Sequence, residues 1–153
     1  MQARRILIPL DGSEMAEAAL PVAESLTGTA DTTLVLVRAT EAPATLADIV
    51  APRLDAIAAV ERYLETVAAE LRARRFPNVD TVPLYGPASS AILEAVRTYE
   101  PDVIVMATSG RSGDRRAMHD SVAETVVRGT QTPVFLVRSD SAARSAERKR
   151  AHV

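Results

Sequence analysis

Two short segments carry the polar residues best placed to do chemistry, and each directly follows a run of aliphatic residues. Asp11-Gly12-Ser13 follows the run from Ile6 to Leu10, and a stretch rich in glycine and arginine follows the run from Val103 to Ala107. Glycine lets backbone N–H groups approach anionic oxygens without a Cβ in the way, and arginine pairs with phosphate groups. Brought together, these residue types would suit a phosphate-bearing ligand.

Each segment supports two interpretations. Asp11-Gly12-Ser13 is either a turn from strand to helix, with Ser13 as the N-cap, or a contact to a nucleotide, and we favour both at once. In the second segment, Arg111, Arg115 and Arg116, together with His119, either hold phosphates or belong to a solvated loop. The sequence leaves this second choice open.

Residues for other kinds of chemistry are missing. The chain has no cysteine, only two histidines and no spacing typical of a metal site. No carboxylate pair is placed for acid–base catalysis, and no Gly-Lys-Ser or Gly-Lys-Thr completes a Walker motif. We therefore expect no catalytic residues and no metal ligands, and so a binding protein rather than an enzyme.

Length and composition predict one globular domain with an aliphatic core. The 153 residues are 47% hydrophobic and 25% charged, and only 3% are aromatic. A net charge of -2 is too balanced to predict a nucleic acid or a membrane as a partner. No apolar run has the length of a membrane span, and the lack of cysteine fits a reducing compartment, so we expect a cytoplasmic protein.

Short aliphatic runs alternate with longer segments of helical period, which is typical of a parallel sheet covered by helices on both faces. We expect strands at residues 6–10, 34–39, 79–84, 103–107 and 133–137. We expect helices at residues 13–27 with a mild kink at Pro21, at 54–74, after a cap at Ser89 or Ser90, and at 121–128. Pro83 cannot donate to a ladder and therefore favours an edge position for the third strand.

The last segment differs in composition from the rest of the chain. Residues 139–153 are polar and highly charged, with no hydrophobic face to bury. Such a segment cannot offset the entropy lost on ordering. We therefore expect a domain at residues 1–138 and a disordered tail at residues 139–153.

Three stretches of the chain resemble the universal stress protein family. They are "ILIPLDGSEMAEAAL" from Ile6, "GPASSAILEAV" from Gly86 continuing into "PDVIVMATSG", and "DSVAETVVRGTQTPVFLV" from Asp120. Their order and separations match the family over about residues 4 to 138. The resemblance implies an α/β fold with a five-stranded parallel sheet in the order 3-2-1-4-5, Rossmann-like and of the adenine nucleotide alpha hydrolase type.

In many relatives the fifth strand forms a dimer, so the resemblance also implies a homodimer through Val134 and Leu136. The implied nucleotide contacts fall on ten residues. They are Pro9, Leu10, Asp11, Ala39, Met106, Ala107, Gly110, Asp120, Ser121 and Val122. Asp11 is implied to lie near adenine or ribose, and Met106 to floor the pocket. For Ala39 and Met106, packing in the core is an equally good interpretation.

The implied phosphate loop departs from the family pattern of Gly, two residues, Gly, nine residues, Gly, then Ser or Thr. Ala107 and Asp120 stand where the first and third glycines would be, while Gly110 and Ser121 match. Asp120 adds bulk and a negative charge where a phosphate would approach a helix N-terminus. Alternatively, residues 121–124, Ser-Val-Ala-Glu, form a capping box that needs no ligand.

Two functions follow from this sequence. The first is a stress-response regulatory protein whose cleft binds ATP or another adenine nucleotide. Asp120 weakens this binding, and magnesium is present only if a nucleotide binds. The second is a dimeric interaction module of the stress response that does not bind ATP and contacts another protein partner. The two hypotheses differ at Asp120.

Overall fold

The computed structural model describes residues 3–28, 31–40, 51–76, 78–108 and 117–139. Five strands form one parallel sheet: β1 (Arg5–Pro9), β2 (Thr33–Thr40), β3 (Val79–Tyr85), β4 (Val103–Thr108) and β5 (Val134–Arg138). The helices are α1 (Glu14–Glu17), α2 (Ala19–Ser25), α3 (Ala51–Ala73), α4 (Ala88–Tyr99) and α5 (Ala117–Gly129).

The strand order is β3-β2-β1-β4-β5, as the resemblance implies. β1 pairs with β2 on one side and with β4 on the other, so these two neighbours of β1 flank the middle of the sheet. β3 and β5 are the two edge strands, which confirms the edge position predicted from Pro83. Each strand ends within one residue of its predicted end.

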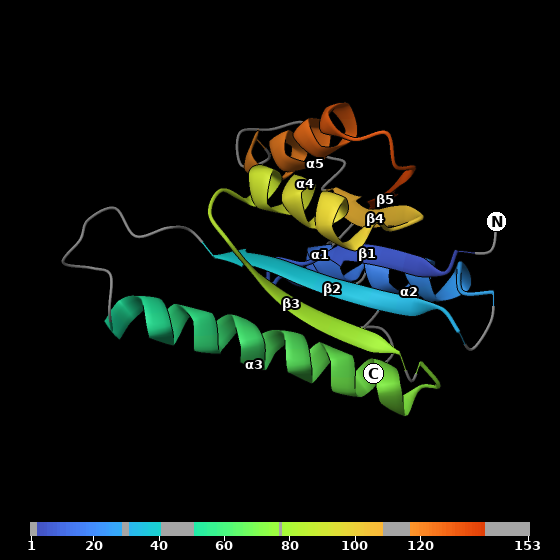
Figure 1. The fold of residues 1–153 in the computed structure, drawn as a ribbon, viewed down its shortest axis with the longest axis horizontal. Coiled ribbons are helices and arrows are strands. Elements are labelled where there is room, and N and C mark those ends of the chain that lie inside the picture. Colours follow the sequence, from blue (N-terminus) through green and yellow to red (C-terminus); the bar gives the residue numbers. More distant parts are fainter. Residues whose placement is uncertain (1–2, 29–30, 41–50, 77, 109–116, 140–153) are drawn as a thin grey trace, which may run out of the picture.

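The core consists of two aliphatic layers, one on each face of the sheet. Alternate residues of the central strands point to opposite faces, because side chains alternate along a strand. Ile6 and Ile8 face α2 and α3, whereas Leu7 faces α4 and α5, and all three are fully buried. The sheet is therefore the middle of three layers, with α3 on one side and α4 and α5 on the other (Figure 1).

The segment after β1 forms two short helices where one kinked helix was predicted. α1 and α2 meet at Ala18, which is the C-cap of the first and the N-cap of the second. Pro21 has no N–H to donate to the carbonyl oxygen of Glu17 four residues earlier, and its ring crowds that carbonyl. The proline is tolerated because it lies in the first turn of α2, where N–H groups have no acceptor within the helix.

The predicted starts of α4 and α5 are wrong. The N-cap of α4 is Pro87, with no side-chain hydrogen bond, so Ser89 and Ser90 lie inside the helix instead of capping it. α5 begins at Ala117, four residues before the predicted start. α3 starts at Ala51, three residues earlier than predicted, and residues 41–50 before it lie outside the described residues.

Candidate functional site

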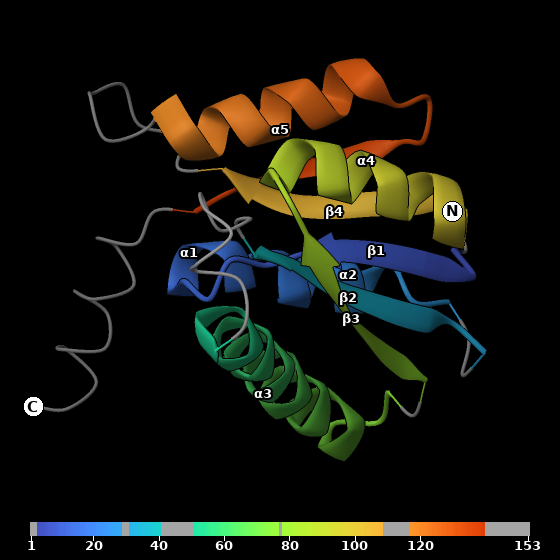
Figure 2. The same ribbon diagram turned by 60° about the vertical axis from the view of Figure 1, so that its left-hand side comes forward.

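The site lies where the carboxyl ends of β1 and β4 meet. These strands are adjacent, but the helices that follow them cover opposite faces of the sheet: α1 belongs to the layer of α2 and α3, and α5 to the layer of α4. Figure 2 shows α1 and α5 on opposite sides of the two strands. Divergent connections of this kind open a crevice, which is where ligands bind in open α/β sheets.

A cavity of about 190 Å³ occupies this crevice. Its lining comes from β1 and the turn after it, from α1, and from the ends of β2 and β4 and the starts of α4 and α5. The lining residues are Pro9, Leu10, Asp11, Met15, Ala16, Val37, Ala39, Ala88, Ile92, Met106, Ala107 and Val122. Asp11 is the only residue of this described lining with a charged or polar side chain, so an apolar group such as a flat ring fits the cavity.

Seven of the ten residues implied by the resemblance line this cavity: Pro9, Leu10, Asp11, Ala39, Met106, Ala107 and Val122. Leu10 and Met106 are each only 5% exposed, so they belong to the core and to the cavity wall at once. Gly110 lies outside the described residues, as do Arg111, Arg115 and Arg116.

Asp120 and Ser121 are the fourth and fifth residues of α5. The predicted capping box is therefore wrong, because a helix that begins at Ala117 has no need of a cap at Ser121. Glu124, its expected acidic member, instead pairs with Arg128 at 2.8 Å, four residues further along the same helix. Asp120 remains within the first turns of α5, at the positive end of the helix dipole.

The turn that carries Asp11 is held by local hydrogen bonds. Asp11 Oδ1 accepts a hydrogen bond from the backbone N–H of Ser13 at 2.8 Å and another from its hydroxyl. Ser13 Oγ in turn accepts from the N–H of Ala16 at 3.1 Å, which confirms Ser13 as the N-cap of α1. The Asp11 carboxylate is thus fixed at the mouth of the cavity by the start of the helix.

Gly12 allows a second support for the same turn. Its φ of +87° lies in the left-handed region, and a Cβ there would stand 2.8 Å from Nη1 of Arg38. The Arg38 guanidinium lies over the ring of Tyr63, 4.9 Å from the ring centroid, and the Tyr63 hydroxyl donates to Glu17 Oε1 at 2.8 Å. β2, α3 and α1 therefore meet beneath the turn that carries Asp11.

This cluster changes the acidity of Tyr63. Burial raises the pKa of its hydroxyl most strongly, and the hydrogen bond to Glu17 and the negative charge of Glu17 raise it further. The Arg38 guanidinium acts in the opposite direction but is outweighed. Tyr63 therefore stays protonated, and keeps donating to Glu17, well above the pH at which an exposed tyrosine ionises.

Five lining residues were not predicted: Met15, Ala16, Val37, Ala88 and Ile92. The sequence spacing could have predicted three of them. Val37 lies two residues before Ala39 on the same face of β2, and Ala88 and Ile92 are four residues apart on one face of α4. Met15 and Ala16 lie in the single turn of α1, directly after the N-cap.

A second hollow, of about 480 Å³, lies at the opposite end of the sheet. Its lining includes Arg97, Glu100 and Pro101, which precede β4, and Gln131 and Thr132, which precede β5. Ligands of open α/β sheets bind at the carboxyl ends of the strands, so this hollow is in the wrong place for such a site.

Within the residues that the structure describes, no group of three or more histidine, cysteine, aspartate or glutamate side chains is arranged to hold a metal ion. None of the helices found there is both long enough and apolar enough to cross a membrane.

Comparisons with known proteins agree with the geometry. Universal stress protein MJ0531 of Methanocaldococcus jannaschii is 35% identical over 60 residues, which is 39% of this chain and about a third (35%) of that relative's length. The structure of UspA from Lactobacillus plantarum is 25% identical with a TM-score of 0.73, covering 90% of this chain and 99% of that one.

A further solved structure, of a universal stress protein in complex with cAMP, has a TM-score of 0.69 and is 18% identical. The match covers 92% of this chain and 100% of that one, and at this identity it shows the shared fold alone. The sequence model of the universal stress protein family matches residues 2–138. With this match over most of its length and with the strand order of the fold, the chain belongs to the universal stress protein family.

Proposed function

We propose that this protein is a stress-response regulator whose cleft between β1 and β4 binds an adenine nucleotide. The single observation that carries the proposal is the cavity at this position, apolar in its described lining apart from Asp11 at its mouth. A base can lie against this apolar lining, and a carboxylate can accept hydrogen bonds from ribose hydroxyls or from the amino group of adenine. The solved relative with cAMP supports the same ligand class.

The size of the cavity suggests which part of the nucleotide it holds. Small-molecule pockets commonly measure about 300–1,000 Å³, and the described cavity measures about 190 Å³. We infer that it holds the base and part of the ribose. The phosphates would then extend past Ala107 towards the first turns of α5, where Asp120 stands at the position of a family glycine.

Asp120 sets the expected preference among nucleotides. Its carboxylate repels phosphate charge, and the repulsion grows with the number of phosphates. We propose that the protein binds nucleotides of low charge better than ATP, and that magnesium enters only together with a nucleotide. The proposal assigns no reaction to the cleft, because no described lining side chain besides Asp11 can act as an acid, a base or a nucleophile.

We also propose that the protein forms a homodimer through β5. The alternative function, a dimeric interaction module without ATP, would use the same homodimer. Leu136 is 49% exposed and Phe135 and Val127 are each 42% exposed, so three of the four large exposed apolar residues in the described part lie on β5 or α5. A second copy that adds a strand at β5 would cover them. We place the protein in the cytoplasm, since a chain without cysteine suits a reducing compartment.

Calorimetry with cAMP tests whether the cleft is the binding site. Ala39→Leu adds bulk inside the cavity, and Ala69→Leu adds the same bulk on the exposed side of α3. We expect the wild type and Ala69→Leu to bind cAMP equally, and Ala39→Leu to bind at least about tenfold more weakly, a difference of about 1.4 kcal/mol. Lack of binding by the wild type, or equal binding by all three proteins, would contradict the proposal and favour the interaction module.

A further inference from the structure

The two edges of the sheet differ in how far they are open to another strand. In a parallel ladder, alternate residues direct their backbone groups to the neighbouring strand, and the residues between them direct theirs away. An edge strand therefore presents every second residue's N–H and C=O as a template for pairing. The register shows which residues these are on β3 and on β5.

On β3, the groups that face away from the sheet belong to the odd-numbered residues. The N–H of Leu34 donates to the carbonyl of Asn78, and the N–H of Gly86 donates to the carbonyl of Thr40, both at 2.9 Å. Even-numbered residues from 78 to 86 therefore face β2. Val79, Thr81, Pro83 and Tyr85 present their backbone groups to the outside.

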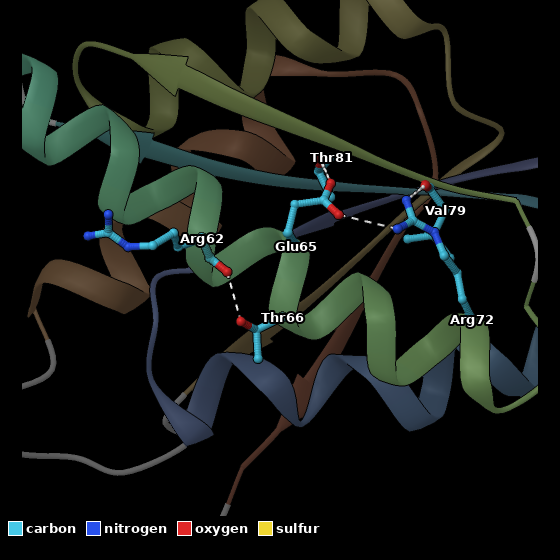
Figure 3. Close-up of polar contacts among 6 residues, drawn as sticks. All are labelled: Arg62, Glu65, Thr66, Arg72, Val79 and Thr81. Atoms are coloured by element: carbon cyan, nitrogen blue, oxygen red, sulfur yellow. Dashed lines mark hydrogen bonds and ion pairs between the residues drawn. The ribbon is translucent and has the colours of Figure 1, made fainter.

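Arg72 occupies the outer edge at Val79. Its Nη2 donates to the carbonyl oxygen of Val79 at 2.7 Å, so the last turn of α3 reaches across to the strand (Figure 3). The hydrogen bond places the guanidinium where the N–H of an added strand would have to lie. An incoming strand would have to displace a charged donor from this acceptor.

Glu65 holds Arg72 in this position. One carboxylate oxygen accepts from Arg72 Nη1 at 3.2 Å, and the other accepts from the hydroxyl of Thr81 at 2.7 Å (Figure 3). These hydrogen bonds, that from Thr81 first and that from Arg72 second, lower the pKa of Glu65 and keep it charged. The three side chains form a chain of contacts along the outer side of β3.

Pro83, which lies two outward positions beyond Val79, closes the edge in a different way. Proline has no N–H, so β3 offers no donor to an added strand at this residue. Two of the four outward positions are thus altered, on either side of Thr81: the acceptor at Val79 is occupied, and the donor at Pro83 is missing. On β5, by contrast, the backbone groups of Val134 and Leu136 face outward, because Pro133 and Ser139 bond to β4.

We propose that Arg72, Glu65, Thr81 and Pro83 close the β3 edge to a second copy of this chain, so that copies add only at β5. This rests in part on the proposed β5 dimer. With one open edge the assembly ends at two copies, whereas two open edges would let chains add without limit. The polar cluster on α3 and β3 is then the feature that keeps a dimer from growing into longer assemblies.

The proposal is tested with variants that open the β3 edge, by measuring the mass of the particles that they form in solution. Arg72→Ala with Pro83→Val restores an acceptor and a donor at the edge, and Arg62→Ala with Pro83→Val is the matched control. Arg62 lies on the exposed side of the same helix, and its side chain does not reach β3 in Figure 3. Sedimentation velocity is run on both variants and the wild type over a range of concentrations, with circular dichroism to establish that each is folded.

We expect the Arg72 variant to form species of at least twice the mass of the wild type, growing with concentration, and the Arg62 variant to keep the wild-type mass. Equal mass in all three proteins would overturn the proposal. If this double variant does not fold, Arg72→Ala with Pro83→Thr restores the same acceptor and donor and carries the test, and an unchanged mass at the highest concentration overturns the proposal.

A third variant separates this proposal from the β5 dimer. Leu136→Asp is added to the variant with the open β3 edge. If the triple variant has the mass of a dimer while Leu136→Asp alone is monomeric, the result supports closure of the β3 edge. A monomeric triple variant contradicts it. A wild type that is itself monomeric refutes only the β5 dimer, because the masses of the variants are still compared with the wild type.

Discussion

Tyr63 shows how a residue outside the cleft supports one inside it. The Arg38 guanidinium stacks over its ring, and its hydroxyl donates to Glu17. Arg38 also fills the space that a side chain at residue 12 would need. None of these contacts follows from sequence spacing, because the three partners are brought together only by the packing of α1 and α3 on β2. The sequence could predict Asp11-Gly12-Ser13 as a turn but not what lies beneath it.

The raised pKa of Tyr63 gives a direct prediction. In the folded protein Tyr63 holds its proton above the ordinary value of about 10, so its contribution to the free energy of unfolding is complete below pH 10 and declines as the pH rises beyond it. In an ultraviolet titration, the wild-type spectrum minus that of Tyr63→Phe should give a tyrosine that ionises above pH 10.

Tyr85→Phe is the control, since it also removes one of the three tyrosines, but from the exposed end of β3. It should leave the late ionisation in place. Tyr63→Phe should also lower the free energy of unfolding by about 1 kcal/mol, the net value of a hydrogen bond, in a urea titration. A difference spectrum with its midpoint at about pH 10 would show that Tyr63 is not held as described.

At the scale of elements, the sequence predicted the strands better than the helix ends. Strands buried on both faces are runs of aliphatic residues, and Pro83 alone identified an edge. Helix starts were predicted from caps, and the rule held at Ser13 but failed at α4, where Pro87 precedes the first turn. A helix can begin without a side-chain cap when packing holds it, and packing cannot be read from local sequence.

The candidate site was predictable to the extent that it follows from the topology and the family resemblance. Leu10, Asp11 and Met106 reach the cavity because strand ends converge where β1 and β4 meet. The lining from α1 and α4, such as Met15 and Ile92, depends on how those helices approach the sheet. The hydrogen bond from Arg72 to Val79 could not be predicted from the sequence either, because it depends on how α3 packs beside β3.

At the scale of the whole molecule, the distribution of apolar surface is uneven. β5 and α5 carry Phe135, Leu136 and Val127, whereas the closed β3 edge carries only Tyr85 among the large exposed apolar residues of the described part. An exposed edge with apolar side chains is a site for pairing, and the opposite edge is covered by polar contacts. We therefore expect a dimer with one interface.

Leu136→Asp tests this interface in light scattering. A charge on an open edge strand opposes pairing, so the variant should be monomeric at concentrations where the wild type has the mass of a dimer. Tyr85→Asp makes the same type of change at the other edge and should leave the dimer intact. A wild type that is monomeric at every concentration, or a dimeric Leu136→Asp, would refute the β5 interface.

The central claim, an adenine-nucleotide cleft hindered at its phosphate end, is tested most directly by calorimetry with ATP and magnesium on the wild type, Asp120→Asn and Asp120→Gly. We expect weak binding by the wild type. Asp120→Asn should bind about fivefold more tightly, since a charged group at a helix N-terminus contributes about 1 kcal/mol. Asp120→Gly should bind more tightly still. Wild-type affinity equal to that of Asp120→Gly would contradict the role of Asp120, and no binding by any of the three would contradict the cleft's function.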